Sequence, residues 1–505
     1  MDVPSASDKS WALYLTQILK KSQQKSKPAL STLSITTLLS GCKSGGLIDE
    51  NVGGDPSASV SPLNVELYNP SENSLVPYCC NVIGINSAEV SPDRHIVLMN
   101  IMFDVPLTTG EEAANKSNLL VFEIINGVLE LIDQSVILGN GGGFHFGDIS
   151  GDETKEAVML LAGEDGRMID GAASVKKQNL IIDLVNGTET YFGVPSWSHG
   201  GAMVDLTGDG KSEIIDAYFY DDGSRIYDGR TLEIIQSGSV FSAGPGPNSF
   251  AFADVDLDGR QDFYQRFEDR YSENSENLIL GRVHSIEQNL LFPVTQEFIL
   301  GSFDGPTVPY VSWNGNPESP DAYVMGNFLN VQFGAYGSWY TAVEDLNGDS
   351  FPDIFEIIGF TTFHDTGLGY YVDGDMELKI LTILSDDGAF YSENARLIDL
   401  PFSGSHHGNK LFDFNKDGHL DVYFSISDNT NGEGYKISDR IYLNDGEGNF
   451  SKISSSVDFG IPDEITRNGS YTPVEFDGET YLVGITSGVN GESLSTIILP
   501  ISEVL

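Results

Sequence analysis

The chain has 505 residues, and its 74 acidic and 27 basic side chains give a formal charge of −47 at pH 7. Nucleic acids and anionic membranes are polyanions, so this charge argues against both as partners. The length allows a sizeable core, and 55 Gly, 28 Phe and 21 Tyr are typical of many short strands and turns.

The N-terminal residues differ in composition from the rest of the chain. Four lysines between residues 20 and 27 precede an apolar run from Ala29 to Leu39, and the letters LSGC end at Cys42. This order resembles a bacterial lipoprotein signal, in which the chain is cleaved before the cysteine and the thiol is acylated. The resemblance implies a protein of the bacterial cell envelope or surface, with membrane contact only through a lipid anchor at Cys42. A secreted protein and a soluble cytoplasmic tail are the alternatives.

Three segments are predicted: a signal-like segment (residues 1–42), a flexible tether rich in Gly, Ser, Pro and Asp (residues 43–64) and one folded domain (residues 65–505). The two remaining cysteines are the adjacent Cys79 and Cys80, which form either a vicinal disulfide or two free thiols. Neither arrangement is a disulfide framework, so we expect bound cations and packing to hold the fold.

Five short acidic loops recur along the chain, each between two strand-like apolar runs. They are DISGDETKE from Asp148, DLTGDGKSE from Asp205, DVDLDGRQD from Asp254, DLNGDSFPD from Asp345 and DFNKDGHLD from Asp413. Oxygen-bearing side chains recur at the first, third, fifth and ninth places, so each loop can surround one hard cation such as Ca²⁺. Three loops have Gly at the sixth place, where the backbone must turn sharply. Glu153 and Ser350 stand there in the first and fourth loops, which predicts weaker sites.

The residues around the loops indicate which kind of calcium loop this is. An EF-hand needs a helix on each side and a bidentate Glu at the twelfth place. Only one of the five loops has a Glu at that place; the twelfth residues are Met159, Asp216, Gln265, Glu356 and Phe424. Runs such as FAFA before a loop and DIFEII after another favour β-strands instead. The predicted unit is therefore strand, calcium loop, strand.

The repeat spacing predicts the architecture. Successive first aspartates are 57, 49, 91 and 68 residues apart, which suits four-stranded blades. Weaker copies begin at Glu89 and Glu475, and counting both gives seven units that close into a ring. The long step predicts an insertion from Leu278 to Trp339, although the string from Asn314 is an alternative eighth unit. The fold class is therefore all-β, a seven-bladed β-propeller, with eight blades as the alternative.

The phrases HGGAMVDLTGDGKSE, FAFADVDLDGRQD and YLNDGEGNF resemble the FG-GAP and VCBS-type repeats of integrin-like β-propellers, over residues 80–490. The resemblance implies calcium ligands between the first and second strands of a blade. The predicted Ca²⁺ ligands, with the seventh-place residues included, are Asp148, Ser150, Asp152, Thr154 and Glu156; Asp205, Thr207, Asp209, Lys211 and Glu213; Asp254, Asp256, Asp258, Arg260 and Asp262; Asp345, Asn347, Asp349, Phe351 and Asp353; Asp413, Asn415, Asp417, His419 and Asp421. The alternative for any one loop is a solvated turn without a cation, which leaves its like charges to repel each other.

Two classes of function remain open. The favoured one is an extracytoplasmic binding or adhesion module for a protein or glycan ligand. The alternative is a polysaccharide-active, lyase-like enzyme that uses histidines and aromatic residues at the channel mouth. The residues of that predicted funnel are His145, Trp197, His199, Trp339, Tyr340, His406 and His407. No nucleophile elbow, HExxH motif or phosphate loop is present, so no catalytic residue is predicted.

Overall fold

The computed structural model divides the chain into two compact units, residues 1–55 and 56–505. The structure describes residues 59–63, 65, 67–69, 74–76, 81–91, 94–102, 116–125, 127–139, 143–161, 177–196, 198–218, 224–238, 250–269, 278–287, 290–302, 310–312, 322–324, 332–365, 370–401, 409–424, 440–453, 469–487 and 494–501. Cys42, Cys79 and Cys80 lie outside these residues, as does the lysine cluster. No helix within the described ranges is long and apolar enough to span a membrane.

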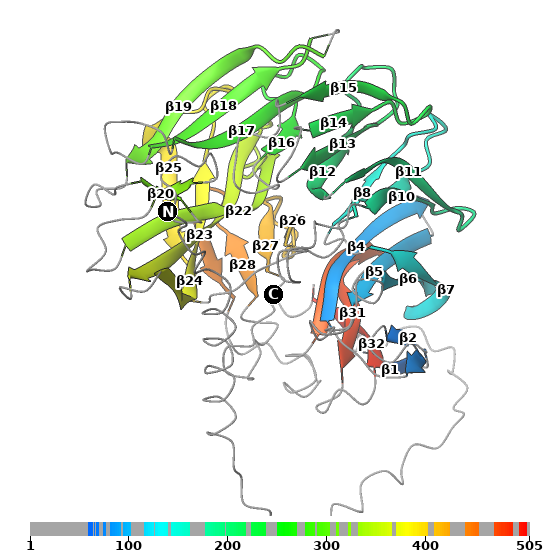
Figure 1. Ribbon diagram of the computed structural model, residues 1–505. Coiled ribbons are helices and arrows are strands. Elements are labelled where there is room, and N and C mark those ends of the chain that lie inside the picture. Colours follow the sequence, from blue (N-terminus) through cyan, green and yellow to red (C-terminus); the bar gives the residue numbers. More distant parts are fainter. Residues whose placement is uncertain are drawn as a thin grey trace, which may run out of the picture. The chain divides into compact units, whose positions relative to one another are not determined.

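Seven antiparallel sheets of four strands each build an all-β, seven-bladed β-propeller (Figure 1). Blades 1 to 3 contain β4 (Asn81–Ser91), β5 (Arg94–Met102), β6 (Lys116–Ile125) and β7 (Val128–Leu138); β8 (Phe144–Gly147), β9 (Glu156–Met159), β10 (Lys177–Asp183) and β11 (Glu189–Ser196); β12 (Ser198–Val204), β13 (Glu213–Tyr218), β14 (Ser224–Tyr227) and β15 (Ile234–Gly238). Blades 4 to 6 contain β16 (Phe250–Ala253), β17 (Asp262–Asp269), β18 (Leu278–Ser285) and β19 (Val294–Ser302); β22 (Gln332–Glu344), β23 (Asp353–Asp365), β24 (Tyr370–Ile383) and β25 (Ala395–Asp399); β26 (Lys410–Phe412), β27 (Asp421–Tyr423), β28 (Ile441–Asn444) and β29 (Phe450–Lys452).

The seventh blade is built from both ends of the folded domain. Strands β30 (Gly469–Phe476), β31 (Glu479–Ser487) and β32 (Leu494–Pro500) follow one another, and β1 (Ser59–Leu63) pairs with β32 as the fourth strand. Figure 1 shows the blue β1 beside the red β32. The last residues of the predicted tether are therefore a strand that closes the propeller.

Removal of β1 is expected to open this closure. A chain that starts after Leu63 loses the backbone hydrogen bonds that β1 makes with β32, from Ser59–Ile498 to Leu63–Leu494. It also exposes an unpaired strand edge, which favours aggregation. We expect a lower melting temperature and more aggregation in light scattering than for a chain that starts at Pro56. Equal melting of the two chains would show that β1 does not contribute to closure.

The core lies between neighbouring blades, because each blade buries both of its faces. On β6, burial is nearly continuous along KSNLLVFEII, whereas the outer strand β7 is mostly exposed. Phe122 of blade 1 shares one cluster with Val483 of blade 7. Phe355 of blade 5 shares another with Phe424 of blade 6. Strands covered on two sides need apolar residues at consecutive positions, which explains the short apolar runs.

The structure confirms seven blades and corrects the extent of the insertion. The seven predicted units, from Glu89 to Glu475, each fall at the first hairpin of a blade. Residues predicted as insertion include β18, β19 and part of β22, which belong to blades 4 and 5. The segment between those blades contains a separate two-stranded sheet, β20 (Tyr310–Ser312) with β21 (Ala322–Val324), so the string from Asn314 is not an eighth blade. A second small sheet joins β2 (Leu67–Asn69) to β3 (Ser74–Val76), and a short 3-10 helix, η3, spans Ser392–Asn394.

Candidate metal centres

The five acidic loops lie at equivalent positions in blades 2 to 6. Each connects the first strand of its blade to the second, namely β8 to β9, β12 to β13, β16 to β17, β22 to β23 and β26 to β27. This is the position that the resemblance to FG-GAP-type repeats implies. The first strands of neighbouring blades contact one another, as β4 does with β8 and β30, so the first strand is the innermost. Each loop therefore starts from a strand next to the central channel.

The first aspartate of each loop holds the turn through backbone N–H groups. In the fourth loop, Asp345 Oδ1 accepts from Gly348 N at 2.7 Å, and Asp345 Oδ2 accepts from Ser350 N at 2.8 Å. The bond from the sixth-place N–H to the first carboxylate recurs in the other loops, from Glu153 at 2.7 Å, Gly210 at 2.8 Å, Gly259 at 2.8 Å and Gly418 at 3.0 Å. This repetition shows that the five loops share one conformation.

The fifth-place aspartates fix the seventh-place residues. Their carboxylates accept the seventh backbone N–H, at 2.9 Å from Thr154, 3.0 Å from Lys211, 2.9 Å from Arg260, 2.8 Å from Phe351 and 2.9 Å from His419. The side chains of Lys211 and Arg260 also pair with the fifth carboxylates, at 3.6 and 3.5 Å. The seventh place thus accepts side chains as different as Thr, Lys, Arg, Phe and His, because the backbone N–H makes the shared contact; proline, which lacks this N–H, does not fit.

The ninth-place carboxylates begin the second strands and are the most buried members. Each accepts the second-place backbone N–H, at 3.0 Å for Glu156, 2.8 Å for Glu213, 3.0 Å for Asp262, 2.9 Å for Asp353 and 2.9 Å for Asp421. The other oxygens of Asp353 and Asp421 accept from Ser385 N at 2.7 Å and Asn444 N at 2.8 Å. These two carboxylates therefore join three segments of their blade.

Burial makes the ionised form of these ninth-place groups costly. It raises the pKa of Glu213 to about 7 and that of Asp262, Asp353 and Asp421 to about 6, and the other carboxylates of each loop add to the shift. The pKa of Glu156 is raised for the same reason. A divalent cation among these oxygens would favour the ionised form and offset the cost.

The third loop brings carboxylates closest together. Oxygen atoms of Asp254, Asp256 and Asp262 lie within 4.8 Å of one another, the one such acidic group among the described residues. Asp258 is not part of that group. The other loops have Ser150, Thr207, Asn347 or Asn415 at the third place, which are neutral oxygen donors. The predicted ligand set of the third loop thus contains three converging carboxylates.

The fourth and sixth places of each loop have a left-handed backbone. The sixth place has positive φ throughout, including 69° at Glu153 and 78° at Ser350, where an L-residue is strained. Ser350→Gly relieves this strain but adds conformational entropy to the unfolded chain, which opposes the gain. We expect a net rise of about 0.5–1 kcal/mol in the free energy of unfolding. Ser350→Ala keeps the strain and should give no gain. Denaturant unfolding of the two variants measures the difference, and equal stabilities would contradict strain at this position.

The raised pKa values predict how stability depends on pH without a cation. A folded-state pKa of about 6 for Asp353 and Asp421, against an ordinary value of 3.8, means that the folded state binds more protons than the unfolded chain in that window. In EGTA, the contribution of these groups to the free energy of unfolding should therefore fall as pH rises from about 4, near the unfolded pKa, to about 7, just above the folded pKa. Saturating calcium should weaken or reverse the slope. Glu213→Gln removes one titrating group and should flatten the slope in EGTA; an unchanged slope would contradict the assignment.

The predicted funnel of histidines and aromatic residues is described only in part. The side chains of Trp197, His199, Trp339, His406 and His407 lie outside the described residues. His145, on β8, is half-buried, and burial together with the charge of Lys410 lowers its pKa to about 4, so it is neutral at pH 7. Tyr340 packs edge-on against Phe355 with ring centroids 6.0 Å apart, and burial raises the pKa of its phenol.

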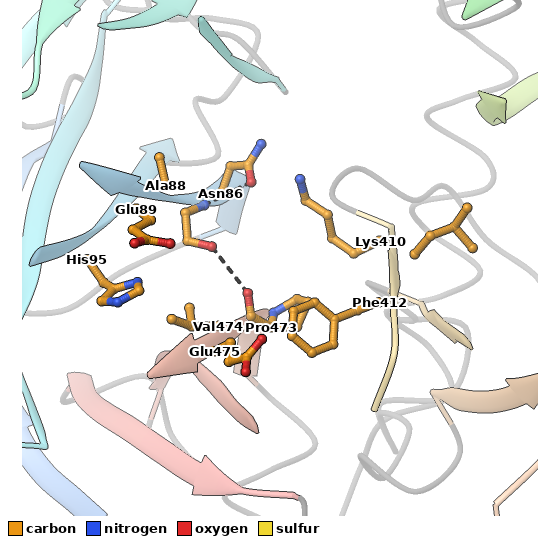
Figure 2. Close-up of a pocket in the computed structure, with 11 residues that line it drawn as sticks. Asn86, Ala88, Glu89, His95, Lys410, Phe412, Pro473, Val474 and Glu475 are labelled. Carbon is orange, nitrogen blue, oxygen red and sulfur yellow. Dashed lines mark hydrogen bonds between the residues drawn. The ribbon is translucent and has the colours of Figure 1, made fainter. Parts of the chain in front are cut away.

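Sequence reasoning missed a pocket beside the channel. The pocket has a volume of about 310 Å³ and lies where β4, β26 and β30 meet (Figure 2). Lys410, on β26, stands three residues before Asp413, and Asn86 stands three before Glu89. His145 has the same place before Asp148, so the repeat register was the available signal. Residue types alone do not predict the pocket, because its lining residues come from segments more than 300 residues apart in the chain.

No protein-family model and no curated protein sequence matches the chain. Among solved structures, the Vibrio cholerae biofilm matrix protein Bap1 is 11% identical, with 88% of this chain and 91% of that chain covered and a TM-score of 0.35. The WD40 domain of Toxoplasma gondii coronin is 11% identical, with coverages of 88% and 87% and a TM-score of 0.39. The exotype rhamnogalacturonan lyase YesX is 12% identical, with coverages of 85% and 90% and a TM-score of 0.31. The fold assignment therefore rests on the strand pairing described above, and the resemblance to FG-GAP and VCBS-type repeats rests on the loop motifs.

Proposed function

We propose that this chain is a calcium-binding β-propeller that acts as a binding or adhesion module for a protein or glycan. The observation that carries the calcium assignment is the convergence of Asp254, Asp256 and Asp262 within 4.8 Å in a loop conformation shared by five blades. The ligand atoms are all oxygens, which suit a hard cation rather than zinc or copper. Calcium accepts variable coordination by carboxylates, amides and hydroxyls, which matches the variable third place better than magnesium does.

The position of the loops supports a scaffold role for the cations. Each loop lies between the two inner strands of a blade, so a bound ion would hold those strands together at one end. A chain with 3 Cys in 505 residues has few covalent cross-links available for this purpose. Calcium then replaces disulfides as the stabilising device, and the surfaces of the propeller remain available for a ligand.

We further propose that the module is displayed outside the cytoplasm, in the bacterial envelope or on the surface, through a lipid on Cys42. The lysine-rich and apolar order before Cys42 supports this location. Calcium levels outside the cytoplasm also suit loops of modest affinity. Mass spectrometry of the mature N-terminus tests the proposal, since an unprocessed, unacylated chain would refute it.

The calcium assignment is tested by elemental analysis and calorimetric titration of the purified protein. We expect bound calcium in the native protein. The double variant with Asp254→Asn and Asp256→Asn keeps the size of both side chains but removes two charges, and it should bind one ion fewer. Ser451→Asn, on the exposed strand β29, is a control and should keep all ions. A glycan and protein array with and without chelator then tests the binding role. Absence of calcium from the native protein would overturn the first claim, and absence of any ligand would overturn the second.

A further inference from the structure

The pocket of about 310 Å³ lies at the junction of blades 6, 7 and 1. Its walls come from the first strands β26, β30 and β4, with His95 added by β5. Blades 7 and 1 are the two whose first hairpins, at Glu475 and Glu89, lack the full acidic loop. Two of the three blades that build the pocket thus lack a full acidic loop, and the third wall, β26, leads directly into the fifth loop at Asp413.

Lys410 supplies the positive charge of the pocket. Figure 2 shows its amine pointing across the pocket toward Asn86. Within the part of the chain that the structure describes, no carboxylate lies within ion-pair distance of the Lys410 amine, although the whole chain has 74 acidic side chains. Burial lowers the pKa of Lys410 to about 8, so the ammonium form still predominates at pH 7. A half-buried ammonium without a carboxylate partner is costly, and an anionic ligand would offset that cost.

The neighbouring groups leave the amine available to a ligand. Asn86 is already oriented, since its Nδ2 donates to Phe144 O at 2.8 Å and its Oδ1 accepts from Ser87 N at 2.8 Å. Ser87 Oγ donates to Pro473 O at 3.2 Å, which ties blade 1 to blade 7 across the pocket. These bonds hold the wall in place before any ligand arrives, and such preorganisation lowers the cost of binding.

The rest of the pocket suits hydroxyl groups and a sugar ring. Figure 2 shows the exposed carboxylate of Glu89 on the side away from Lys410, near His95, and the exposed carboxylate of Glu475 beside Val474 and Phe412. Carboxylates accept hydrogen bonds from hydroxyls but repel a second anionic group. Phe412 and Pro473 add apolar surface between the two ends. The pocket is therefore cationic at one end, hydrogen-bond accepting at the other and apolar between them.

We propose that this pocket binds a single sugar-acid residue, with its carboxylate on Lys410 and its hydroxyls toward Glu89 and Glu475. A ligand with one negative charge fits a chain of charge −47 better than a polyanion does, because a lone short-range ion pair outweighs screened repulsion from the distant surface. The inference names the glycan class for the proposed binding module and assigns it to blades 6, 7 and 1.

The test is a calorimetric titration of the full chain with galacturonate in calcium buffer, beside galactose and acetate. Galactose lacks the carboxylate and acetate lacks the hydroxyls, so both should bind at least about tenfold more weakly. Lys410→Met keeps the length of the side chain and should weaken galacturonate binding by about tenfold or more, while Lys410→Arg should retain part of it. Lys452→Met, on the exposed β29 of the same blade, changes the charge equally and should bind as the unaltered chain does.

The opposite results would overturn the inference. These are equal affinities for galacturonate and galactose, equal affinities for galacturonate and acetate, no binding of galacturonate, or unaltered binding by Lys410→Met. The melting temperature of each variant is recorded with and without EGTA in the same samples. A calcium-dependent melting temperature with no galacturonate binding would refute this pocket alone, whereas calcium-independent melting would refute the proposed metal loops alone. Glu475→Gln leaves Lys410 intact and provides a second variant. It should weaken galacturonate binding, while acetate should still bind more weakly than galacturonate.

Discussion

Removal of calcium with EGTA is expected to lower the melting temperature by about 10 °C or more. A ligand that binds only the folded state at about 100 times its Kd adds about 2.7 kcal/mol per site, and five blades have equivalent loops. The effect is enlarged because raised carboxylate pKa values, such as about 7 for Glu213, make the loops unfavourable without a cation. Differential scanning calorimetry with excess calcium, EGTA and restored calcium measures it.

Magnesium and sodium provide the controls for this experiment. Magnesium should restore little of the loss, because it keeps its waters and demands stricter octahedral geometry than these loops offer. Sodium chloride at matched ionic strength separates calcium binding from general screening of the large negative charge. Superimposable melting curves in calcium and EGTA would show that the acidic loops are ordinary turns.

Asp421→Ala is expected to be among the most destabilising single substitutions. Asp421 is fully buried, and its two oxygens accept the backbone N–H groups of Phe414 at 2.9 Å and Asn444 at 2.8 Å. Its removal leaves two buried donors without acceptors, at about 1–3 kcal/mol each, so we expect a loss of about 2–6 kcal/mol. Chemical denaturation measures this loss, and the hydrogen-bond part should persist in EGTA.

Asp417→Ala is the matched control in the same loop. Asp417 is exposed and accepts from His419 N at 2.9 Å, so its removal leaves no buried donor without an acceptor. We expect a small loss in EGTA and a larger one in calcium, since the substitution removes one ligand of the proposed ion. Similar losses for the two variants in both buffers would contradict the separation of scaffold and ligand roles.

Much of the fold was predictable because local and repeated signals agree. Short apolar runs predict strands, and the steps of 49 to 91 residues between Asp148, Asp205, Asp254, Asp345 and Asp413 predict one blade per step, with an insertion in the longest. The sequence predicts too wide an insertion because β18 and β19 follow no acidic motif of their own and lie within the long step between two loops. The closing strand β1 was missed since its partner β32 lies more than 430 residues away.

The repeated unit of this protein, an acidic loop between two strands, can be recognised from the amino-acid sequence alone. The reason is that the hydrogen bonds shared by the five loops join residues no more than nine places apart in the sequence. Which carboxylates are buried and which converge depends on contacts that are distant in sequence, since Asp353 and Asp421 also accept N–H groups from Ser385 and Asn444, 32 and 23 residues further along the chain. The pocket beside Lys410 likewise exists only where blades 6, 7 and 1 meet, because ring closure alone brings β4, β26 and β30 together.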